Sequence, residues 1–218
     1  MKTCYYIDWF DGALPEKLVK LLHEDLTDRK SFVMLSANCP VEDEEINLTK
    51  NTWLGQAGIV FDEYHLINRD VLKSDAQKLV QEASVIFLLG GYTVWQSEFL
   101  AEYELPELIR KSDAVVMGAS AGSINMSAKW LCSKLNGYEV ETSTVYDGIG
   151  LNNFSFEAHI ELDNTALIYN ELFPLSEKID IYAAEYGSAI RTKNNAVDII
   201  GNVHLISRSK ILKLEETI

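Results

Sequence analysis

The chain has 218 residues, of which 47% are hydrophobic and 24% are charged, so it is long enough to bury a substantial core. Its 33 acidic residues outnumber 19 basic residues, and the formal net charge is -14 at pH 7. This balance offers no basic stripe for a phosphate backbone, so we expect no nucleic-acid partner. No apolar run approaches the ~18 residues of a membrane helix. The N-terminus lacks the length and cleavage context of a signal peptide. We expect one cytoplasmic domain over residues 1–218, with no membrane partner.

The cysteines and acidic residues show no metal-binding or disulfide pattern. Cys4, Cys39 and Cys132 are odd in number and lack CxxC spacing. The histidines and carboxylates lack a spacing such as HExxH. We therefore expect no metal and no cofactor.

The first 120 residues alternate short apolar runs with amphipathic segments. Strands are predicted at 4–7, 32–35, 64–67, 85–89 and 114–117. Helices are predicted at 15–26, 42–56, 74–83 and 97–110. Continuously apolar strands separated by helices indicate an α/β fold, with a mostly parallel sheet covered on both faces.

Beyond about residue 140 the pattern changes. Segments 154–160 and 179–184 are predicted to continue the sheet around a helix at 164–172. Short strands follow at 188–191, 197–200, 203–206 and 211–214. The turn residues between them, Asn194-Asn195 and Gly201-Asn202, predict antiparallel hairpins at the C-terminus.

Ser120 lies between the predicted strand 114–117 and a predicted helix at 121–130. The surrounding residues, Gly-Ala-Ser-Ala-Gly at 118–122, fit the GxSxG pattern of a nucleophile elbow, which presents a serine hydroxyl at the strand end. Small residues at such a junction also serve packing and capping, with Ser120 or Ser123 as the N-cap. The motif alone leaves both readings open.

A second glycine-rich turn ends the predicted strand 85–89. The residues VIFLLGGYT at 85–93 place Gly90-Gly91 directly after it. If the two strands are neighbours, the Gly91 N–H can act as a second oxyanion donor. A glycine corner or a phosphate loop are the alternatives, although the segment lacks the lysine of a Walker loop and the spacing of GxGxxG.

The two turns together resemble the peptidase E family of serine peptidases, which includes aspartyl dipeptidases and cyanophycinase-like enzymes. LLGGYT at 88–93 and MGASAGS at 117–123 carry the resemblance. Four further segments are similar to the family: FVMLSANCP at 32–40, DGIGL at 147–151, EAHIELD at 157–163 and AAEYGSAIR at 183–191. The resemblance implies the flavodoxin-like three-layer sandwich of class I glutamine amidotransferases, with serine in place of the nucleophilic cysteine.

The activity that this resemblance implies is hydrolysis of small peptides, without a cofactor. Ser120 would be the nucleophile, His159 the base and Glu185 the acid that orients the imidazole. The backbone N–H groups of Gly91 and Ala121 would form the oxyanion hole.

The residues alone, without the resemblance, do not select one histidine as the base or one carboxylate as the acid. The chain has only four histidines: His23, His65, His159 and His204. Asp147, Glu157 and Glu161 compete with Glu185 for the role of the acid.

The chain also departs from the family pattern. Tyr92 stands where the family has Asn, and no Arg follows His159 as it does in aspartyl dipeptidases. Arg191 is the nearest candidate for binding a substrate carboxylate. Specificity for Asp therefore stays open.

Two other classes of protein compete with this interpretation. An α/β-hydrolase esterase also uses GxSxG, and would need Ser120, Asp180 or Asp198, and His204 in that order. A non-catalytic amidotransferase-like binding module is the second alternative. Retention of Ser120, His159 and Glu185 favours an enzyme over the binding module.

Overall fold

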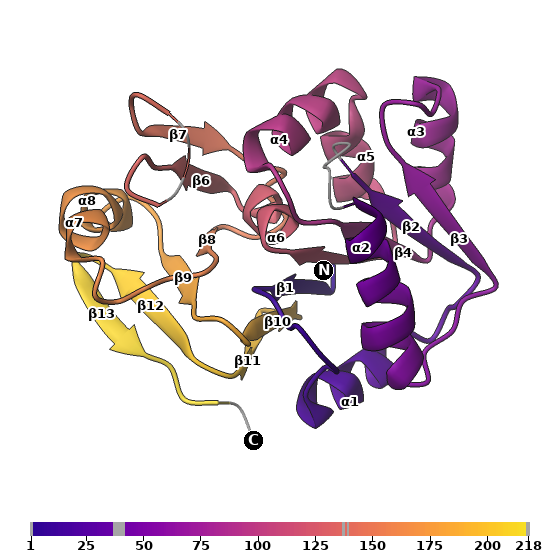
Figure 1. The fold of residues 1–218 in the computed structure, drawn as a ribbon, viewed down its shortest axis with the longest axis horizontal. Coiled ribbons are helices and arrows are strands. Elements are labelled where there is room, and N and C mark those ends of the chain that lie inside the picture. The colour runs from indigo at the N-terminus through magenta and orange to yellow at the C-terminus, as the bar shows by residue number, and fades with distance from the viewer. Residues whose placement is uncertain (1, 37–41, 137, 139, 217–218) are drawn as a thin grey trace.

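The computed structural model describes residues 2–36, 42–136, 138 and 140–216, and its centre is a seven-stranded sheet (Figure 1). The strand order is β11-β10-β1-β5-β4-β2-β3. The parallel strands are β1 (Cys4–Ile7), β2 (Ser31–Leu35), β3 (Glu63–Ile67), β4 (Val85–Leu88) and β5 (Val115–Ala119). An antiparallel hairpin, β10 (Ala189–Lys193) and β11 (Ala196–Ile200), extends the sheet beyond β1.

Helices cover both faces of this sheet. On one face lie α1 (Glu16–Asp25), α2 (Glu42–Asn47) and the π-helical segment η1 (Leu48–Leu54). On the other lie α3 (Lys73–Glu82), α4 (Thr93–Glu102), α5 (Leu105–Lys111) and α6 (Ala121–Met126). Successive residues of β1 and β4 alternate between the two resulting cores, and both strands are buried along their whole length. This confirms the predicted α/β fold with a mostly parallel, doubly covered sheet.

A second sheet lies beside the first, on the left of Figure 1. Its order is β13-β12-β9-β8, from β8 (Ser155–Glu157), β9 (Ile181–Ala184), β12 (Val203–Ser207) and β13 (Lys210–Lys213). A short helical stretch packs on it through apolar residues, comprising α7 (Thr165–Leu167), η2 (Ile168–Leu172) and α8 (Phe173–Ser176). The prediction that 154–160 and 179–184 continue the main sheet was therefore wrong, because β10 occupies the edge of β1 and β9 pairs with β12 instead.

Two predicted helices have different bounds in the structure. The predicted helix 97–110 is two helices, because Glu104 between α4 and α5 adopts a left-handed conformation at φ 57° and Pro106 lies in the first turn of the second helix. The predicted helix 121–130 ends at Met126. Its last residues form β6 (Lys129–Cys132), which pairs with β7 (Thr144–Asp147), and Trp130 stacks on Tyr146 there.

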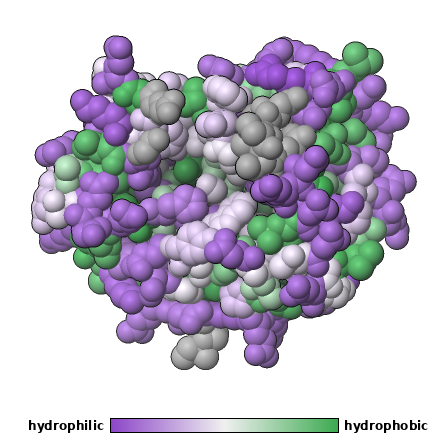
Figure 2. All heavy atoms as spheres, in the orientation of Figure 1, coloured by the Kyte–Doolittle hydropathy of each residue, from purple (hydrophilic) through white to green (hydrophobic). Residues whose placement is uncertain are grey.

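The face shown in Figure 2 is mostly hydrophilic, with separate hydrophobic spots. Across the described ranges, no helix has the length and hydrophobicity needed to cross a membrane. Cys4 and Cys132 are buried free thiols. Cys39 and the predicted loop after β2, at 37–40, lie outside the described residues.

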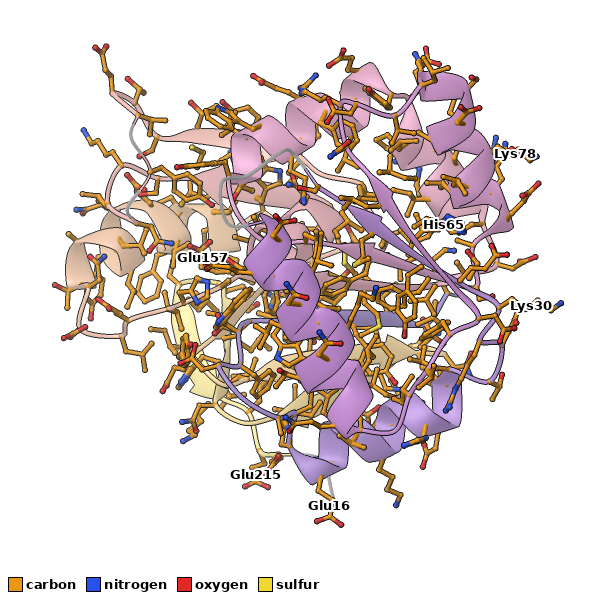
Figure 3. All side chains as sticks on the ribbon, turned by 45° about the vertical axis from the view of Figure 1, so that its right-hand side comes forward. Glu16, Lys30, His65, Lys78, Glu157 and Glu215 are labelled. Atoms are coloured by element: carbon orange, nitrogen blue, oxygen red, sulfur yellow. The ribbon has the colours of Figure 1, made fainter. Side chains whose placement is uncertain are left out.

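A buried carboxyl group in the second sheet gives a prediction for stability. Glu157 lies inside the molecule, unlike the peripheral Glu16 and Glu215 (Figure 3). Burial raises the pKa of Glu157 to about 8. The Asn136 amide, which donates to this carboxyl, opposes the shift, and the charge of Glu171 adds to it.

We expect the free energy of unfolding to fall as pH rises from the unfolded pKa of Glu157 to its folded pKa. Between the unfolded pKa of about 4.3 and the folded value of about 8, only the native state holds the proton, so stability is highest below the window. Urea unfolding of wild type and Glu157→Gln should agree below the unfolded pKa, at about pH 3.5. At pH 8.5 the variant should be more stable by up to about 5 kcal/mol. Parallel pH profiles for the two proteins would contradict this prediction.

Candidate active site

Ser120 occupies a strained turn between β5 and α6. Its backbone lies at φ 47° and ψ -114°, a region that costs a non-glycine residue about 1–3 kcal/mol. The Ser120 N–H donates to the carbonyl oxygens of Ile7 (2.9 Å) and Asp8 (3.0 Å), which fixes the turn against the end of β1. The Ser120 hydroxyl caps no helix N–H, and that of Ser123 contacts the backbone of Ile7 and Gly118. The capping alternative is therefore not what the structure shows.

The two glycines of the motif are required by close backbone packing. A Cβ on Gly118 would lie 2.6 Å from the Ser123 nitrogen, and one on Gly122 would lie 2.0 Å from the Leu88 carbonyl oxygen. Both distances are shorter than the closest approach that a Cβ makes to a backbone atom. The glycines thus allow α6 to start directly above β4 and β5, with Ser120 at the turn.

His159 brings its imidazole to the Ser120 hydroxyl. Its Nε2 lies 2.8 Å from Ser120 Oγ, within hydrogen-bond distance. His159 follows β8 and has a left-handed backbone conformation at φ 55°. The next residue anchors this loop, because the Ile160 N–H donates to the Ala184 carbonyl at the end of β9. The predicted pair of Ser120 and His159 is therefore brought together, and both residues carry strained backbones.

Asp8 contacts the other nitrogen of the same imidazole. Its Oδ1 lies 3.0 Å from His159 Nδ1 and also accepts the backbone N–H of His159. The Asp8 side chain is fully buried. Asp8 directly follows β1 and Ser120 directly follows β5. These strands are parallel neighbours with Ile7 paired to Ala119, so both residues leave the sheet at the same edge.

Glu185, the predicted acid, is placed elsewhere. Its Oε1 lies 2.6 Å from His204 Nε2, and its Oε2 accepts from the Asn202 amide at 3.3 Å. Glu185 follows β9, and His204 lies on the neighbouring strand β12, where it is almost fully buried. The structure does not bring Glu185 to His159 as expected, because the Asp8 carboxylate lies at His159 Nδ1 and the Glu185 carboxylate contacts His204.

Three of the other candidate acids have partners elsewhere as well. Asp147 pairs with Lys129, Glu157 accepts from Asn136, and Asp198 pairs with Arg191. His204 lies within hydrogen-bond distance of Glu185, and Ser120 lies within hydrogen-bond distance of His159. The structure therefore does not bring together Ser120, an Asp and His204, as the esterase alternative requires.

The predicted oxyanion donors lie at the same edge of the sheet. β4 and β5 are neighbours with Leu88 paired to Gly118, as the proposal for Gly91 required. Gly91 is exposed and adopts φ 100°, which favours glycine. Ala121 is the first residue of α6, and N–H groups of a first helical turn have no acceptor within the helix. Their role as oxyanion donors stays a prediction.

Three exposed aromatic side chains lie near this edge. Tyr92 and Trp95 are about half exposed, and their ring centroids lie 4.5 Å apart. Tyr186 is also exposed, and its ring centroid lies 6.2 Å from that of His159. These rings give the rim of the site an apolar character.

Arg191, the candidate for a substrate carboxylate, is held inside the fold. Its guanidinium contacts both oxygens of Asp25 at 2.7 and 2.8 Å and Asp198 at 2.8 Å, and the residue is 8% exposed. The structure therefore removes Arg191 from consideration as a free carboxylate receptor. Within the described ranges, no group of three or more His, Cys, Asp or Glu side chains is placed to hold a metal ion.

A parallel α/β sheet with a serine–histidine pair at its carboxyl edge is an arrangement found in several classes of serine hydrolase. The model of peptidase family S51 matches residues 17–200. The chain therefore belongs to peptidase family S51, the peptidase E family, and is a serine peptidase.

Solved structures show the same fold. A candidate peptidase E protein from Listeria monocytogenes EGD-e superimposes with a TM-score of 0.66 at 16% identity, covering 92% of this chain and 98% of its own. A peptidase from an acI-B1 Actinobacterium gives a TM-score of 0.67 at 17% identity, covering 99% of this chain and 95% of its own. No curated protein matches the sequence.

Proposed function

We propose that this serine peptidase hydrolyses small peptides through a Ser120–His159–Asp8 triad and an acyl-enzyme intermediate. The observation that carries the proposal is the continuous line of contacts from Ser120 Oγ to His159 Nε2 (2.8 Å) and from His159 Nδ1 to Asp8 Oδ1 (3.0 Å). Nucleophile, base and orienting acid each lie within reach of the next.

The acylation step follows from this line. His159 Nε2 accepts the Ser120 proton while Oγ attacks the carbonyl carbon of the scissile peptide bond. The carbonyl oxygen becomes an oxyanion, which the N–H groups of Gly91 and Ala121 would stabilise. The protonated His159 then gives its proton to the leaving amine, the C–N bond breaks, and the acyl group stays on Ser120 as an ester.

Water completes the reaction by the same route. His159 accepts a proton from water, the hydroxide attacks the ester, and the proton returns to Ser120 as the carboxylic acid product leaves. Throughout, Asp8 holds Nδ1 protonated so that Nε2 is free to accept. Its buried carboxylate also stabilises the imidazolium that forms.

Three further features support a substrate without an acidic side chain. The Arg191 guanidinium is occupied by two carboxylates, and the rim of the site is aromatic. A substrate carboxylate would also lie close to the buried charge of Asp8. We therefore propose small peptides with a neutral or apolar residue on the acyl side of the scissile bond.

Covalent labelling tests the proposed nucleophile. A fluorophosphonate should modify Ser120 in the wild type, as peptide mapping by mass spectrometry would show, because the hydroxyl is activated by His159. Ser120→Ala should abolish the label and His159→Ala should slow it by at least about 100-fold. Ser74→Ala, which removes an exposed serine on α3, is the matched control and should label normally.

Two other outcomes would replace the proposal. If Ser120 is not modified and no member of a dipeptide library is hydrolysed, the chain acts as a binding module. If activity survives His159→Ala but is lost in His204→Ala, the α/β-hydrolase order is correct.

The substrate preference has its own test. We expect kcat/KM for a Leu-Xaa dipeptide to exceed that for the matching Asp-Xaa dipeptide by at least about tenfold, since an unpaired acidic side chain near Asp8 costs about 1.4 kcal/mol or more. Steady-state kinetics with the two substrates at low salt measure this ratio. A preference for Asp-Xaa would show that another cation reaches the substrate.

A further inference from the structure

The peptide unit between Leu89 and Gly90 is held at both ends by buried side chains. The Gln96 Nε2 group donates to the Leu89 carbonyl at 2.7 Å. On the opposite side of the same peptide, the Gly90 N–H donates to Glu45 Oε1. Because the carbonyl and N–H of a trans peptide point in opposite directions, the two contacts fix the orientation of its plane.

The two side chains come from different elements and are themselves constrained. Glu45 lies on α2 and is 3% exposed, and Gln96 lies on α4 and is fully buried. The Asn125 amide on α6 donates to Gln96 Oε1 at 3.0 Å and also to the Thr93 carbonyl at 3.0 Å. This network therefore connects the glycine turn to the helix that begins immediately after Ser120.

The next peptide unit carries the N–H of Gly91. Two adjacent glycines have wide conformational freedom, and Gly91 sits at φ 100°, so the direction of this N–H is not fixed by local sterics. A donor stabilises an oxyanion well only when it is already aimed before the reaction. The turn therefore needs an external restraint, and the contacts of Leu89 and Gly90 supply one on the preceding peptide.

We propose that Glu45 and Gln96 are positioning residues that clamp the Leu89–Gly90 peptide and thereby aim the Gly91 N–H at the oxyanion. This inference rests on the proposed function of Ser120 and the Gly91 donor. Neither side chain needs to touch the substrate. Their effect is on the transition state, in which the oxyanion exists, and not on substrate binding.

Kinetics of matched variants test the clamp. Gln96→Met keeps the length of the side chain but removes the donor, and Glu45→Ala removes the acceptor. Each should lower kcat by about 10- to 100-fold with KM changed less than about threefold, and should weaken a peptide aldehyde inhibitor by a similar factor. Glu45→Gln, whose amide oxygen can still accept from Gly90, should restore most of the rate.

Thr49→Val is the control for a polar-to-apolar change nearby. Thr49 is buried on η1, directly after α2, and within the described residues its Oγ1 has no hydrogen-bond partner. Its kcat and KM should equal those of the wild type.

Amide hydrogen exchange tests the geometry without relying on activity. The Gly90 amide should be protected in the wild type and exchange at least about tenfold faster in Glu45→Ala. The Leu89 amide, which donates to the Leu35 carbonyl at 3.0 Å, should keep its protection in the variant and so shows that β4 stays folded.

The outcomes separate this inference from the proposed function. Wild-type kcat in both Glu45→Ala and Gln96→Met would overturn the clamp, as would a Gly90 amide that exchanges equally fast in wild type and Glu45→Ala. A raised KM with unchanged kcat would also overturn it, because that result indicates substrate binding. An unreactive wild-type Ser120 would overturn the proposed function, and with it the catalytic part of the clamp, while amide exchange still decides whether Glu45 holds Gly90.

Discussion

Replacing Asp8 with Asn is expected to lower kcat by about 10³- to 10⁴-fold while leaving the fold intact. The substitution keeps the size of the buried side chain but removes the carboxylate that lies 3.0 Å from His159 Nδ1. The imidazole is then free to carry its proton on Nε2, where it cannot accept the Ser120 proton, and the charged imidazolium loses its partner. Steady-state kinetics on a dipeptide substrate, with circular dichroism to check folding, measure the effect.

Glu185→Gln is the matched control for this prediction. Glu185 contacts His204 and Asn202, so its neutral amide should change kcat less than about threefold and act mainly on local stability. If Glu185→Gln instead causes the large loss, and Asp8→Asn does not, then Glu185 is the orienting acid in the active enzyme.

Gly122→Ala is expected to give the largest loss of stability. The added Cβ would lie 2.0 Å from the Leu88 carbonyl oxygen, which belongs to the rigid backbone of β4. Neither the new Cβ nor the Leu88 carbonyl can rotate out of the way as a flexible side chain would. We therefore expect α6 to move away from the sheet, and Ser120 to move with it. We expect about 3 kcal/mol or more of destabilisation, together with loss of activity.

Gly12→Ala is the control, because a Cβ at this exposed position meets no atom within 4 Å. Its free energy of unfolding from urea titration should match the wild type within about 0.5 kcal/mol. Equal stability of the two variants would mean that α6 is not packed on β4 as closely as the structure shows.

Several features of the fold and site could be predicted because their signals are local. Continuous apolar runs identified the five parallel strands, since a strand buried on both faces needs no polar alternation. The GxSxG turn identified Ser120, because only glycine fits where Gly122 meets Leu88. The segment around His159 was found through its resemblance to the peptidase E family, and the structure places its imidazole on Ser120.

The proposed acid, Asp8, could not be chosen in the same way because its position depends on strand pairing. Asp8 is close to Ser120 only because β1 pairs with β5. In this pairing Ile7 lies opposite Ala119, which is 112 residues later in the sequence. A usable signal was present: Asp8 directly follows a buried strand, and carboxyl ends of parallel strands gather at one edge. Glu185 was selected by its motif, and the contact that holds it depends on the pairing of β9 with β12, which periodicity does not reveal.

The protonation states of the His159 and His204 side chains test the identity of the acid most directly. If Asp8 accepts from Nδ1 of His159 and Glu185 accepts from Nε2 of His204, the neutral rings carry opposite protons: Nδ1–H in His159 and Nε2–H in His204. Nitrogen-15 NMR of the labelled imidazoles distinguishes these tautomers, and His159→Gln and His204→Gln assign the signals.

We expect Asp8→Asn to change the ring-nitrogen shifts of His159 alone, and Glu185→Gln to change those of His204 alone. A loss of the Nδ1–H form of His159 in Glu185→Gln, with His159 unaffected by Asp8→Asn, would contradict the Ser120–His159–Asp8 triad.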